Sequence, residues 1–393
     1  TQGGAARLKS APSKTRYHTA IIGAGIVGLM AAYHLVKRGV RAVVILDRAP
    51  ALLLGASGRN GGGIRAQWTT KENIELARRS IVQFRRLAVE TGHNTWFRQG
   101  GYLFLARTEK QLEGLRNAAA FQNQHGVRTR IIDAQGAKDV VPALSTDGVI
   151  GAAFNPDDGT LFPWPVVHGV AEAVRHDGVE VVTNADVQGF ETQGDRVTAI
   201  RSSAGRIEAD HVVLAAGAHS PLVAKHIGID IPTKPQRHEI LVTEALKPYI
   251  DPMLVDLSNG LYASQAMRGE IVGGISYPHV DGHSQESSLD FSTTFAKALL
   301  RLLPQLSGVN MLRQWAGSYD IAPDGRPILG RAGGFENFYV SCGYTGHGFM
   351  IAPMTGQLIA ELITGRKTSL PIDSFRLSRF QEGPIAKEEM VIG

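Results

Sequence analysis

Three glycines follow a short apolar segment near the beginning of the sequence at the spacing Gly-x-Gly-x-x-Gly. The apolar run from His18 to Ile22 predicts a strand, and residues 26–38, which stop before Gly39, predict a helix. In a strand–turn–helix unit the first glycine permits a tight turn, the second lets the backbone approach a diphosphate, and the third lets the helix pack on the strand. The pattern therefore predicts a dinucleotide site formed by Gly23, Ala24, Gly25, Ile26, Val27 and Gly28.

An acidic residue stands at the end of the next predicted strand, residues 41–46. A carboxylate at Asp47 would bind the hydroxyl pair of a ribose and repel a 2′-phosphate, so FAD or NAD is favoured over NADP. The alternative is a glycine-rich turn in an ordinary strand–helix–strand unit, but that alternative leaves the placement of the acid unexplained.

A second glycine-rich loop, residues 55–65, distinguishes a flavin cofactor from a nicotinamide cofactor. A nicotinamide fold has no general need of such a loop after its second strand, whereas a flavin needs backbone donors to cover its diphosphate and ring. Two later apolar strands, predicted at 211–214 and 338–341, also run into small residues, namely 215–217 and 343–350. This arrangement favours FAD.

The chain from Tyr17 to Phe380 resembles the FAD-dependent oxidoreductases of the D-amino-acid oxidase superfamily. Within that superfamily it is most similar to the branch of sarcosine oxidase β-subunits and dye-linked L-proline dehydrogenases. The resemblance is carried by the dinucleotide pattern, Ser57-Gly58-Arg59-Asn60-Gly61-Gly62-Gly63, Trp315-Ala316-Gly317 with Pro323-Asp324-Gly325, and Gly346-His347-Gly348-Phe349-Met350.

The resemblance implies an α/β fold in which a Rossmann-type FAD-binding domain receives an inserted, α+β substrate domain with an antiparallel sheet. We expect residues 17–90, 155–232 and 308–393 in the FAD-binding domain, and 91–154 and 233–307 in the substrate domain. Residues 1–16 are expected to be a flexible basic tail. Helices are predicted from Thr69 onward and at 109–125, 165–175, 289–303 and 351–363, and further strands at 101–106, 149–154, 179–183, 197–200, 206–210, 238–242, 260–264 and 270–276.

Contacts to FAD are implied at residues that match the superfamily motifs. In monomeric sarcosine oxidase a cysteine links to the flavin where this chain has Gly317, so we expect non-covalent FAD; Cys342 is a conceivable attachment point but is expected to be a buried strand-end residue. Arg59 is a cofactor or structural residue. Beyond residues 23–28, the expected contacts are Asp47, Arg48, Ser57, Arg59, Asn60, Gly61, Gly62, Gly63, Val187, Ala216, Gly217, Gly346, His347, Gly348, Phe349 and Met350.

Four side chains are the candidates for contact with a substrate. Arg65 matches an arginine that holds the substrate carboxylate in sarcosine oxidases, although it could instead be a surface residue or a phosphate contact. His347 lies between two glycines in a loop that the resemblance places over the flavin, and a structural role is the alternative. Tyr262 could face the substrate or lie in the core. Tyr319 stands where glycine and D-amino-acid oxidases carry a carboxylate-binding arginine, which argues against that activity.

The expected function is an FAD-dependent dehydrogenase that oxidises a small secondary amino acid. L-proline is the leading substrate, which would pass a hydride to flavin N5 and become Δ1-pyrroline-5-carboxylate, with electrons leaving to a quinone or dye. Three alternatives stay open: a sarcosine, glycine or D-amino-acid oxidase that uses O2, a flavin β-subunit of a multisubunit amine dehydrogenase, and a non-catalytic FAD-binding assembly factor. A homo-oligomer or partner subunits are possible under each.

Composition narrows the class further. Of 393 residues, 43% are apolar and 20% charged, which fits a folded globular chain, and 45 are glycine. One cysteine excludes a disulfide scaffold and favours a reducing compartment, so we expect a cytoplasmic location, with peripheral contact at the inner membrane face as an option. The net charge of +5 does not indicate a nucleic-acid-binding surface. The run 19–33 is too short and too rich in glycine for a membrane anchor. His279 with His283 makes no persuasive metal site.

Overall fold

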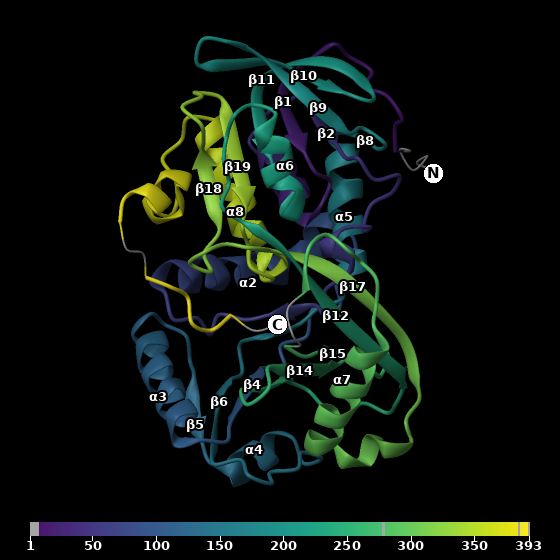
Figure 1. Cartoon of the computed structure of the whole chain (residues 1–393), viewed down its shortest axis with the longest axis vertical. Coiled ribbons are helices and arrows are strands. Elements are labelled where there is room, and N and C mark those ends of the chain that lie inside the picture. Colours follow the sequence, from purple (N-terminus) through teal and green to yellow (C-terminus); the bar gives the residue numbers. More distant parts are fainter. Residues whose placement is uncertain (1–7, 277–279, 384–385, 392–393) are drawn as a thin grey trace.

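The computed structural model describes residues 8–276, 280–383 and 386–391. Residues 1–7 of the predicted tail, and His279, lie outside the described residues. The chain forms an upper and a lower part along its longest axis, and helix α2 (Lys71–Thr91) runs between them (Figure 1). Each part is built around one large sheet.

The upper sheet has eight strands in the order β18-β19-β11-β1-β2-β8, with β10 pairing both β11 and β9. The pairs that β1 makes with β11 and β2 are parallel, as are β2 with β8 and β11 with β19. The strands are β1 (Arg16–Ile22), β2 (Val43–Leu46), β8 (Glu180–Val182), β9 (Val187–Gln193), β10 (Arg196–Ser202), β11 (Gly205–Leu214), β18 (Ile328–Arg331) and β19 (Phe338–Cys342).

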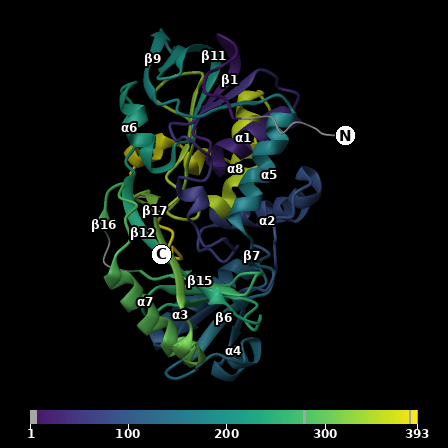
Figure 2. The same ribbon diagram turned by 90° about the vertical axis from the view of Figure 1, so that its right-hand side faces the viewer.

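Both faces of the upper sheet are covered, because alternate side chains of its strands are apolar on each face. Ile21 of β1 packs with the helices α1 (Ile26–Lys37), α5 (Pro163–His176) and α8 (Gly348–Ile363). Ala20 and Ile22 pack on the other face with β9, β10 and α6 (Ser220–Lys225), an arrangement that Figure 2 shows edge-on. The expected Rossmann-type α/β part is confirmed.

The lower sheet has nine strands in the order β16-β12-β15-β14-β13-β4-β6-β5, with β17 paired to β12. It is antiparallel except for the β13–β4 pair. Its strands are β4 (Tyr102–Ala106), β5 (Arg130–Ile132), β6 (Gly151–Asn155), β12 (Lys234–Ala245), β13 (Met253–Asp256), β14 (Leu261–Gln265), β15 (Glu270–Gly274), β16 (Val280–Asp281) and β17 (Met311–Ile321); its helices are α3 (Glu109–Gln124), α4 (Ala134–Val140) and α7 (Leu289–Leu302).

The strands β12 and β17 form one long ribbon, paired from Lys234 with Ile321 to Thr243 with Met311. Residues 311–321 fall in the range expected for the FAD-binding domain, yet β17 is hydrogen-bonded into the lower sheet. We therefore propose that the substrate part extends over 311–321. The other predicted ranges stay proposals.

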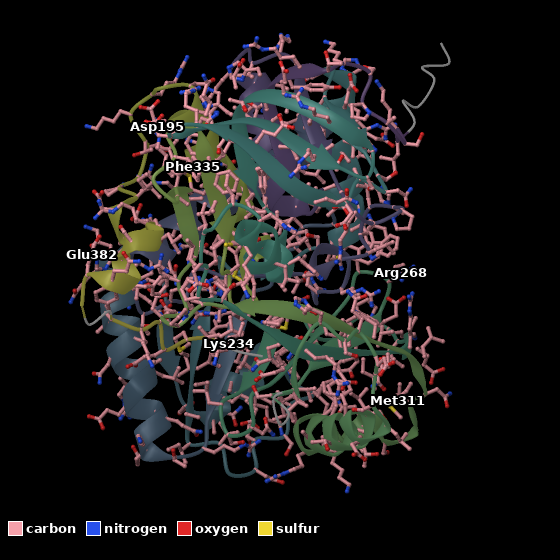
Figure 3. The ribbon with its side chains drawn as sticks, turned by 45° about the horizontal axis from the view of Figure 1, so that its top comes forward. Asp195, Lys234, Arg268, Met311, Phe335 and Glu382 are labelled. Carbon is pink, nitrogen blue, oxygen red and sulfur yellow. The ribbon has the colours of Figure 1, made fainter. Side chains whose placement is uncertain are left out.

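Short elements complete the fold. The two-stranded pair of β3 (Gly63–Ile64) with β7 (Gly159–Thr160) lies in the connection between the two parts. In Figure 3, Asp195 and Phe335 lie near each other on the upper part, where the backbone N–H of Glu336 donates to the Asp195 carbonyl at 3.0 Å. The 3-10 turns are η1 (Ala56–Gly58), η2 (Gly217–His219), η3 (Pro304–Gly308), η4 (Asp373–Phe375) and η5 (Leu377–Gln381).

Residues 8–15 are not the flexible tail that the sequence suggested, and that prediction is wrong for them. The Lys9 backbone pairs with β8, and the Ser13 backbone N–H donates to Glu180 at 2.9 Å. Lys9 also forms an ion pair with Glu180, which Tyr17 contacts too. The segment therefore extends the upper sheet edge.

Two predicted boundaries shift for local reasons. The strand β2 begins at Val43 rather than at 41, because Ala42 has a positive φ of 55° that breaks the extended backbone. The helix α8 begins at Gly348, so Gly348, Phe349 and Met350, expected in a loop, form its first turn. Within the described ranges, no helix is long and apolar enough to cross a bilayer.

Candidate active site

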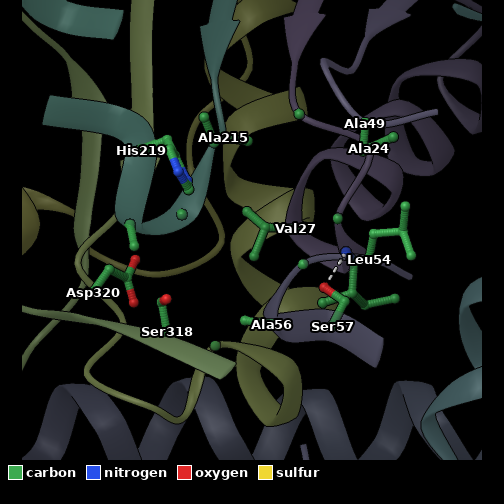
Figure 4. A pocket seen from close by; sticks show the side chains of 18 of the residues that line it. Ala24, Val27, Ala49, Leu54, Ala56, Ser57, Ala215, His219, Ser318 and Asp320 are labelled. Carbon is green, nitrogen blue, oxygen red and sulfur yellow. Dashed lines mark hydrogen bonds between the residues drawn. The ribbon is translucent and has the colours of Figure 1, made fainter. Parts of the chain in front are cut away.

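A cavity of about 680 Å³ lies where the carboxyl ends of β1, β2 and β11 meet the β12–β17 ribbon. This is the edge at which doubly wound sheets bind dinucleotides, and the volume lies in the range of ligand-binding pockets. Figure 4 shows Val27, Ala56 and Ser57 on one side of it and His219, Ser318 and Asp320 on the other. The predicted cofactor residues that line it are Gly23, Ala24, Gly25, Ile26, Val27, Asp47, Arg48, Ser57, Arg59, Asn60, Val187, Ala216, Gly217, Gly346, Gly348 and Phe349.

The glycines at the start of α1 are required by close backbone contacts. A Cβ atom on Gly23, whose φ is +111°, would lie 2.4 Å from the Ala215 carbonyl oxygen. A Cβ on Gly28 would lie 2.0 Å from the Gly23 carbonyl oxygen, and Gly28 does not line the cavity. Gly23 thus permits the turn and Gly28 the packing of helix on strand, as the spacing predicts.

Polar groups at this end of the cavity are held in place by the loops. Asp47 accepts hydrogen bonds from the backbone N–H groups of Ala24 at 2.7 Å and Ala49 at 2.8 Å. Ser57 Oγ accepts from the Ile26 N–H at 2.9 Å, which joins the second glycine-rich loop to the first turn of α1 (Figure 4). Burial, with the nearby Arg48, lowers the pKa of His219 to about 4, so the imidazole is neutral.

Arg59 acts as a structural clamp on the same loop. Its guanidinium donates to the carbonyl oxygens of Leu54 at 3.0 Å and Ala316 at 2.9 Å. It thereby ties the second glycine-rich loop to β17, where Gly317 leaves room for the Arg59 side chain.

A second, smaller cavity of about 70 Å³ adjoins the first and shares Asn60, Tyr319, Gly346 and Phe349 with it. It brings together all four side chains expected to meet a substrate, although they come from distant segments. Arg65 is its only described lining residue with a full charge. Its lining also contains Gly61, Gly62, Gly63, Trp68, Tyr102, Met253, Val255, Tyr262, Thr345, His347 and Met350.

Arg65 is buried, with 4% of its surface exposed. Its guanidinium carbon lies 3.6 Å from the centroid of the Trp68 ring, and its N–H groups donate to the backbone carbonyls of Gln67 and Met390. No described carboxylate pairs with it. Burial lowers the pKa of the guanidinium, and the nearby charges of Glu388 and Asp158 oppose this effect; the group stays charged, so the cavity holds a cation that no described carboxylate contacts directly.

His347 is buried against the same tryptophan, with ring centroids 4.4 Å apart. Its Nδ1 lies 3.2 Å from the Thr345 carbonyl oxygen, which can only accept, so we assign the proton to Nδ1. Burial, followed by the charge of Arg65, lowers the pKa of His347 to about 4. Nε2 is therefore an acceptor, and it has no partner among the described residues.

Three rings close another wall of the two cavities. The Tyr262 hydroxyl lies 3.0 Å from His238 Nε2, and the His238 ring stacks on Tyr319 with centroids 4.7 Å apart. Burial raises the pKa of both tyrosines, so their hydroxyls stay protonated and can donate. These residues come from the paired strands β12 and β17 and from β14, which β15 separates from β12.

Sequence reasoning missed several residues of this site. Trp68 supports both Arg65 and His347, and its position three residues after Arg65 in the same loop was an available signal. His238 lies in a strand with no motif around it, whereas Asp320 lies between Trp315-Ala316-Gly317 and Pro323-Asp324-Gly325, which was an available signal. Asp320 Oδ2 accepts from the Gly343 N–H at 2.7 Å and holds the loop after β19; burial raises its pKa to about 6.

The large cavity fits a flavin dinucleotide. Its first turn tolerates no Cβ at Gly23, its acid is fixed at the end of β2, and buried Ser318 Oγ on its wall has no partner among the described residues. Cys342 lines neither cavity, and burial raises the pKa of its thiol. Gly317 offers no nucleophile, so the residues present favour non-covalent binding.

Known proteins are similar to this chain over almost its whole length. The chain is 31% identical over 386 residues to "sarcosine oxidase subunit beta" of Rhodobacter capsulatus, covering 97% of this chain and 92% of that one. The crystal structure of L-proline dehydrogenase from P. horikoshii superposes with a TM-score of 0.90 at 31% identity, over 94% of this chain and 99% of that one. Glycine oxidase from Geobacillus kaustophilus has the same fold, with a TM-score of 0.87 at 23% identity, covering 93% of this chain and 99% of that one.

A family model described as "FAD dependent oxidoreductase" matches residues 18–362, which is most of the chain and includes both cavities. The relatives at 31% identity span nearly the full length of both partners. The expected cofactor, FAD, is thus confirmed at the level of the family. The chain belongs to the D-amino-acid oxidase family of FAD-dependent oxidoreductases, and it acts on amino acids or related amines.

Proposed function

We propose that the protein is a dehydrogenase of a small secondary amino acid, with L-proline as the leading substrate. The observation that carries this proposal is the second cavity, whose only full charge among the described lining residues is the Arg65 cation. A zwitterionic amino acid brings a carboxylate to such a site, and an arginine is the side chain best suited to bind it.

Each remaining wall of the cavity has a part in this function. Trp68, Tyr102 and Tyr262 provide apolar surface for a pyrrolidine ring and exclude water from it. Nε2 of His347 accepts a hydrogen bond from the substrate N–H, and being neutral at pH 7 it does not repel a cationic amine. Together with Arg65 these groups orient the substrate.

Bound FAD would supply the oxidising power, since it accepts a hydride, with the two electrons of a C–H bond beside the amine nitrogen. After its ammonium group has released one proton, L-proline would lose a hydride from the ring carbon beside nitrogen that does not carry the carboxylate, and then the remaining N–H proton, which gives Δ1-pyrroline-5-carboxylate. The solved L-proline dehydrogenase relative supports this choice of substrate. We propose a quinone or dye as the final acceptor; a quinone would bring the chain to an anionic membrane surface, which its net charge of +5 favours.

A second candidate is a flavin subunit that assembles with partner chains. It is favoured by the relative described as a β-subunit of sarcosine oxidase, and sarcosine is itself a small secondary amine. Purified protein that binds FAD but does not turn over amines alone would support this candidate.

Anaerobic titration of the purified flavoprotein tests the substrate. L-proline, D-proline, sarcosine and glycine are added separately, and bleaching of the flavin absorption band is followed. Bleaching by L-proline, with slow recovery in air and fast recovery with a quinone dye, is the expected result. Bleaching by sarcosine, glycine or a D-amino acid with rapid recovery in air would replace the proposal with an oxidase.

A further inference from the structure

A short segment without helix or strand, residues 386–391, crosses the molecule between α2 and the lower sheet (Figure 1). We call it the latch segment. Its Met390 side chain packs against the apolar residues of both parts, including the group around Tyr102 and Met253 that lines the second cavity. The latch segment thus lies against the site proposed for the substrate.

Glu388 is the anchor of the latch segment, and only 6% of its surface is exposed. Its carboxylate accepts from the backbone N–H groups of Thr69 at 2.8 Å and Thr70 at 3.0 Å, and from their hydroxyls at 2.5 and 2.7 Å. Asn73 Nδ2 donates at 3.2 Å. Thr70 is the N-cap of α2, so the carboxylate also lies at the positive end of that helix.

The charge of Glu388 is preserved by these contacts. Burial by itself raises the pKa of a carboxyl group, but the hydrogen bonds from Thr69 and Thr70 outweigh it and hold the pKa of Glu388 below its ordinary value. The anchor is therefore ionised at neutral pH.

The Glu388 carboxylate is connected to the Arg65 guanidinium through two hydrogen bonds of the Met390 backbone. The Met390 backbone N–H donates to Glu388 Oε1 at 3.1 Å, and the Met390 carbonyl accepts from Arg65. Met390 therefore occupies one of the two terminal nitrogens of the guanidinium, and Gln67, in the same loop as Arg65, occupies the other.

Each terminal nitrogen carries two N–H groups, so a substrate carboxylate that binds Arg65 on the side of Met390 competes with the Met390 carbonyl for the N–H groups of that nitrogen. Gln67 is two residues from Arg65 in the same loop. Met390 reaches Arg65 from a segment held by the Glu388 carboxylate and by two backbone N–H groups, which donate from Glu388 to the Asp324 carbonyl and from Glu389 to Thr69 Oγ1, each at 3.0 Å. A carboxylate is a stronger acceptor for guanidinium than a neutral carbonyl. The exchange at Met390 is therefore favourable in itself and is opposed by the hydrogen bonds of Glu388.

We propose that the latch segment gates the substrate site: the substrate carboxylate replaces the Met390 carbonyl on Arg65, and Glu388 is the positioning residue that sets the cost of this exchange. The proposal deepens the function proposed above and rests on Arg65 as the carboxylate ligand. Glu388 lines neither cavity, so it acts on the site through Met390 and through its negative charge, which favours the charged forms of Arg65 and His347. Cleavage after Lys387 reports the first of these two effects.

The test uses the FAD-loaded protein and two neighbouring variants, Glu388→Gln and Glu389→Gln. Glu389 is exposed, and its replacement removes the same charge without touching the anchor. Trypsin cleavage after the exposed Lys387, identified by mass spectrometry, reports release of the latch segment. Pyrrole-2-carboxylate, an unreactive planar carboxylate, and L-proline are the ligands, and their dissociation constants come from perturbation or bleaching of the flavin band.

We expect either ligand to accelerate cleavage after Lys387 in the unaltered protein. Glu388→Gln should be cleaved faster without ligand and should bind pyrrole-2-carboxylate about 5-fold more tightly, the effect of weakening roughly 1 kcal/mol of hydrogen bonding. Glu389→Gln should behave like the unaltered protein.

Slower or unchanged cleavage with pyrrole-2-carboxylate, or weaker ligand binding in Glu388→Gln, would mean that the latch segment is a fixed part of the cavity wall. Either result would overturn the proposal that it gates the site. If L-proline bleaches the flavin in no variant while pyrrole-2-carboxylate still accelerates cleavage, the choice of substrate fails and the gate stands.

Discussion

At the scale of single residues, the site depends on one cation that no described carboxylate contacts directly. Arg65 is stacked on Trp68 and hydrogen-bonded only to carbonyl oxygens among the described residues, so its charge is available to a ligand. An arginine that served only the fold would more commonly be paired with a carboxylate when buried, as Arg379 is with Asp324. The difference in environment separates a binding residue from a structural one.

Replacement of this cation should abolish tight substrate binding. In Arg65→Gln the dissociation constant of L-proline, measured by anaerobic bleaching, should rise about 30- to 1000-fold, which corresponds to the roughly 2–4 kcal/mol lost when a buried charge pair loses one partner. Arg98→Gln is the control, since Arg98 also donates to a carbonyl, that of Gln265, but lines neither cavity. Equal affinity in both variants would make Arg65 structural.

At the scale of elements, the sequence predicts the nucleotide-binding half well. The spacing of Gly23, Gly25 and Gly28 after an apolar run specifies strand, turn and helix locally, because a Cβ on Gly23 or Gly28 would collide with backbone at a neighbouring strand end or within a few residues. The second cavity is different. His238, Tyr262 and Tyr319 meet only through the pairing of β12, β14 and β17, and no local pattern encodes that register.

The latch segment shows the same limit more strongly. Glu388 meets Thr69 and Thr70 across most of the chain length, and nothing in the surrounding sequence marks it as buried. The resemblance to known flavoproteins identified Arg65, but it carried no information on which backbone carbonyls surround the guanidinium.

The packing of α1 on α8 leads to a prediction about stability. A Cβ on Gly356 of α8 would lie 2.6 Å from a backbone carbon of Met30, so Gly356→Ala forces the helices apart and should lower the free energy of unfolding by about 1–3 kcal/mol. Because both helices begin at the large cavity, FAD affinity should fall as well. Thermal unfolding followed by flavin fluorescence measures both effects.

Gly114 supplies the matched control for that helix substitution. It lies inside α3, and a Cβ added there would meet nothing within 4 Å. Gly114→Ala should therefore raise stability by up to about 1 kcal/mol through helix propensity alone. If both variants lost stability equally, close packing of α1 on α8 would not be the cause.

At the scale of the whole molecule, buried titratable groups set the response to acid. Burial lowers the pKa of His34, His211, His219 and His347 to about 4 each, so the unfolded chain binds these protons first as the pH falls below 6.5. Asp158 and Asp320 act in the opposite sense, since burial raises their pKa values to about 7 and 6. The four histidines together have a larger effect than the two aspartates, so the free energy of unfolding should fall between pH 6.5 and pH 4.

His34 offers the test, because it lies in α1 away from both cavities. Its folded pKa is lowered, so the stability that it contributes is complete above pH 6.5 and is lost toward pH 4. Chemical unfolding at saturating FAD should show a loss from pH 7 to pH 5 that is about 2 kcal/mol smaller in His34→Gln than in the unaltered protein. An identical loss in both would assign the acid sensitivity to other groups.

The burial of the single cysteine has a practical consequence for experiments on this protein. Cys342 ends β19 inside the upper sheet, and burial raises the pKa of its thiol, so reagents for thiols reach it only when that strand separates from its neighbours. Since the chain has one cysteine, the rate at which Cys342 is labelled, measured by mass spectrometry, reports how often the nucleotide-binding half opens. No engineered probe is needed. Ligands that move only the lower sheet would leave the rate of Cys342 labelling unchanged.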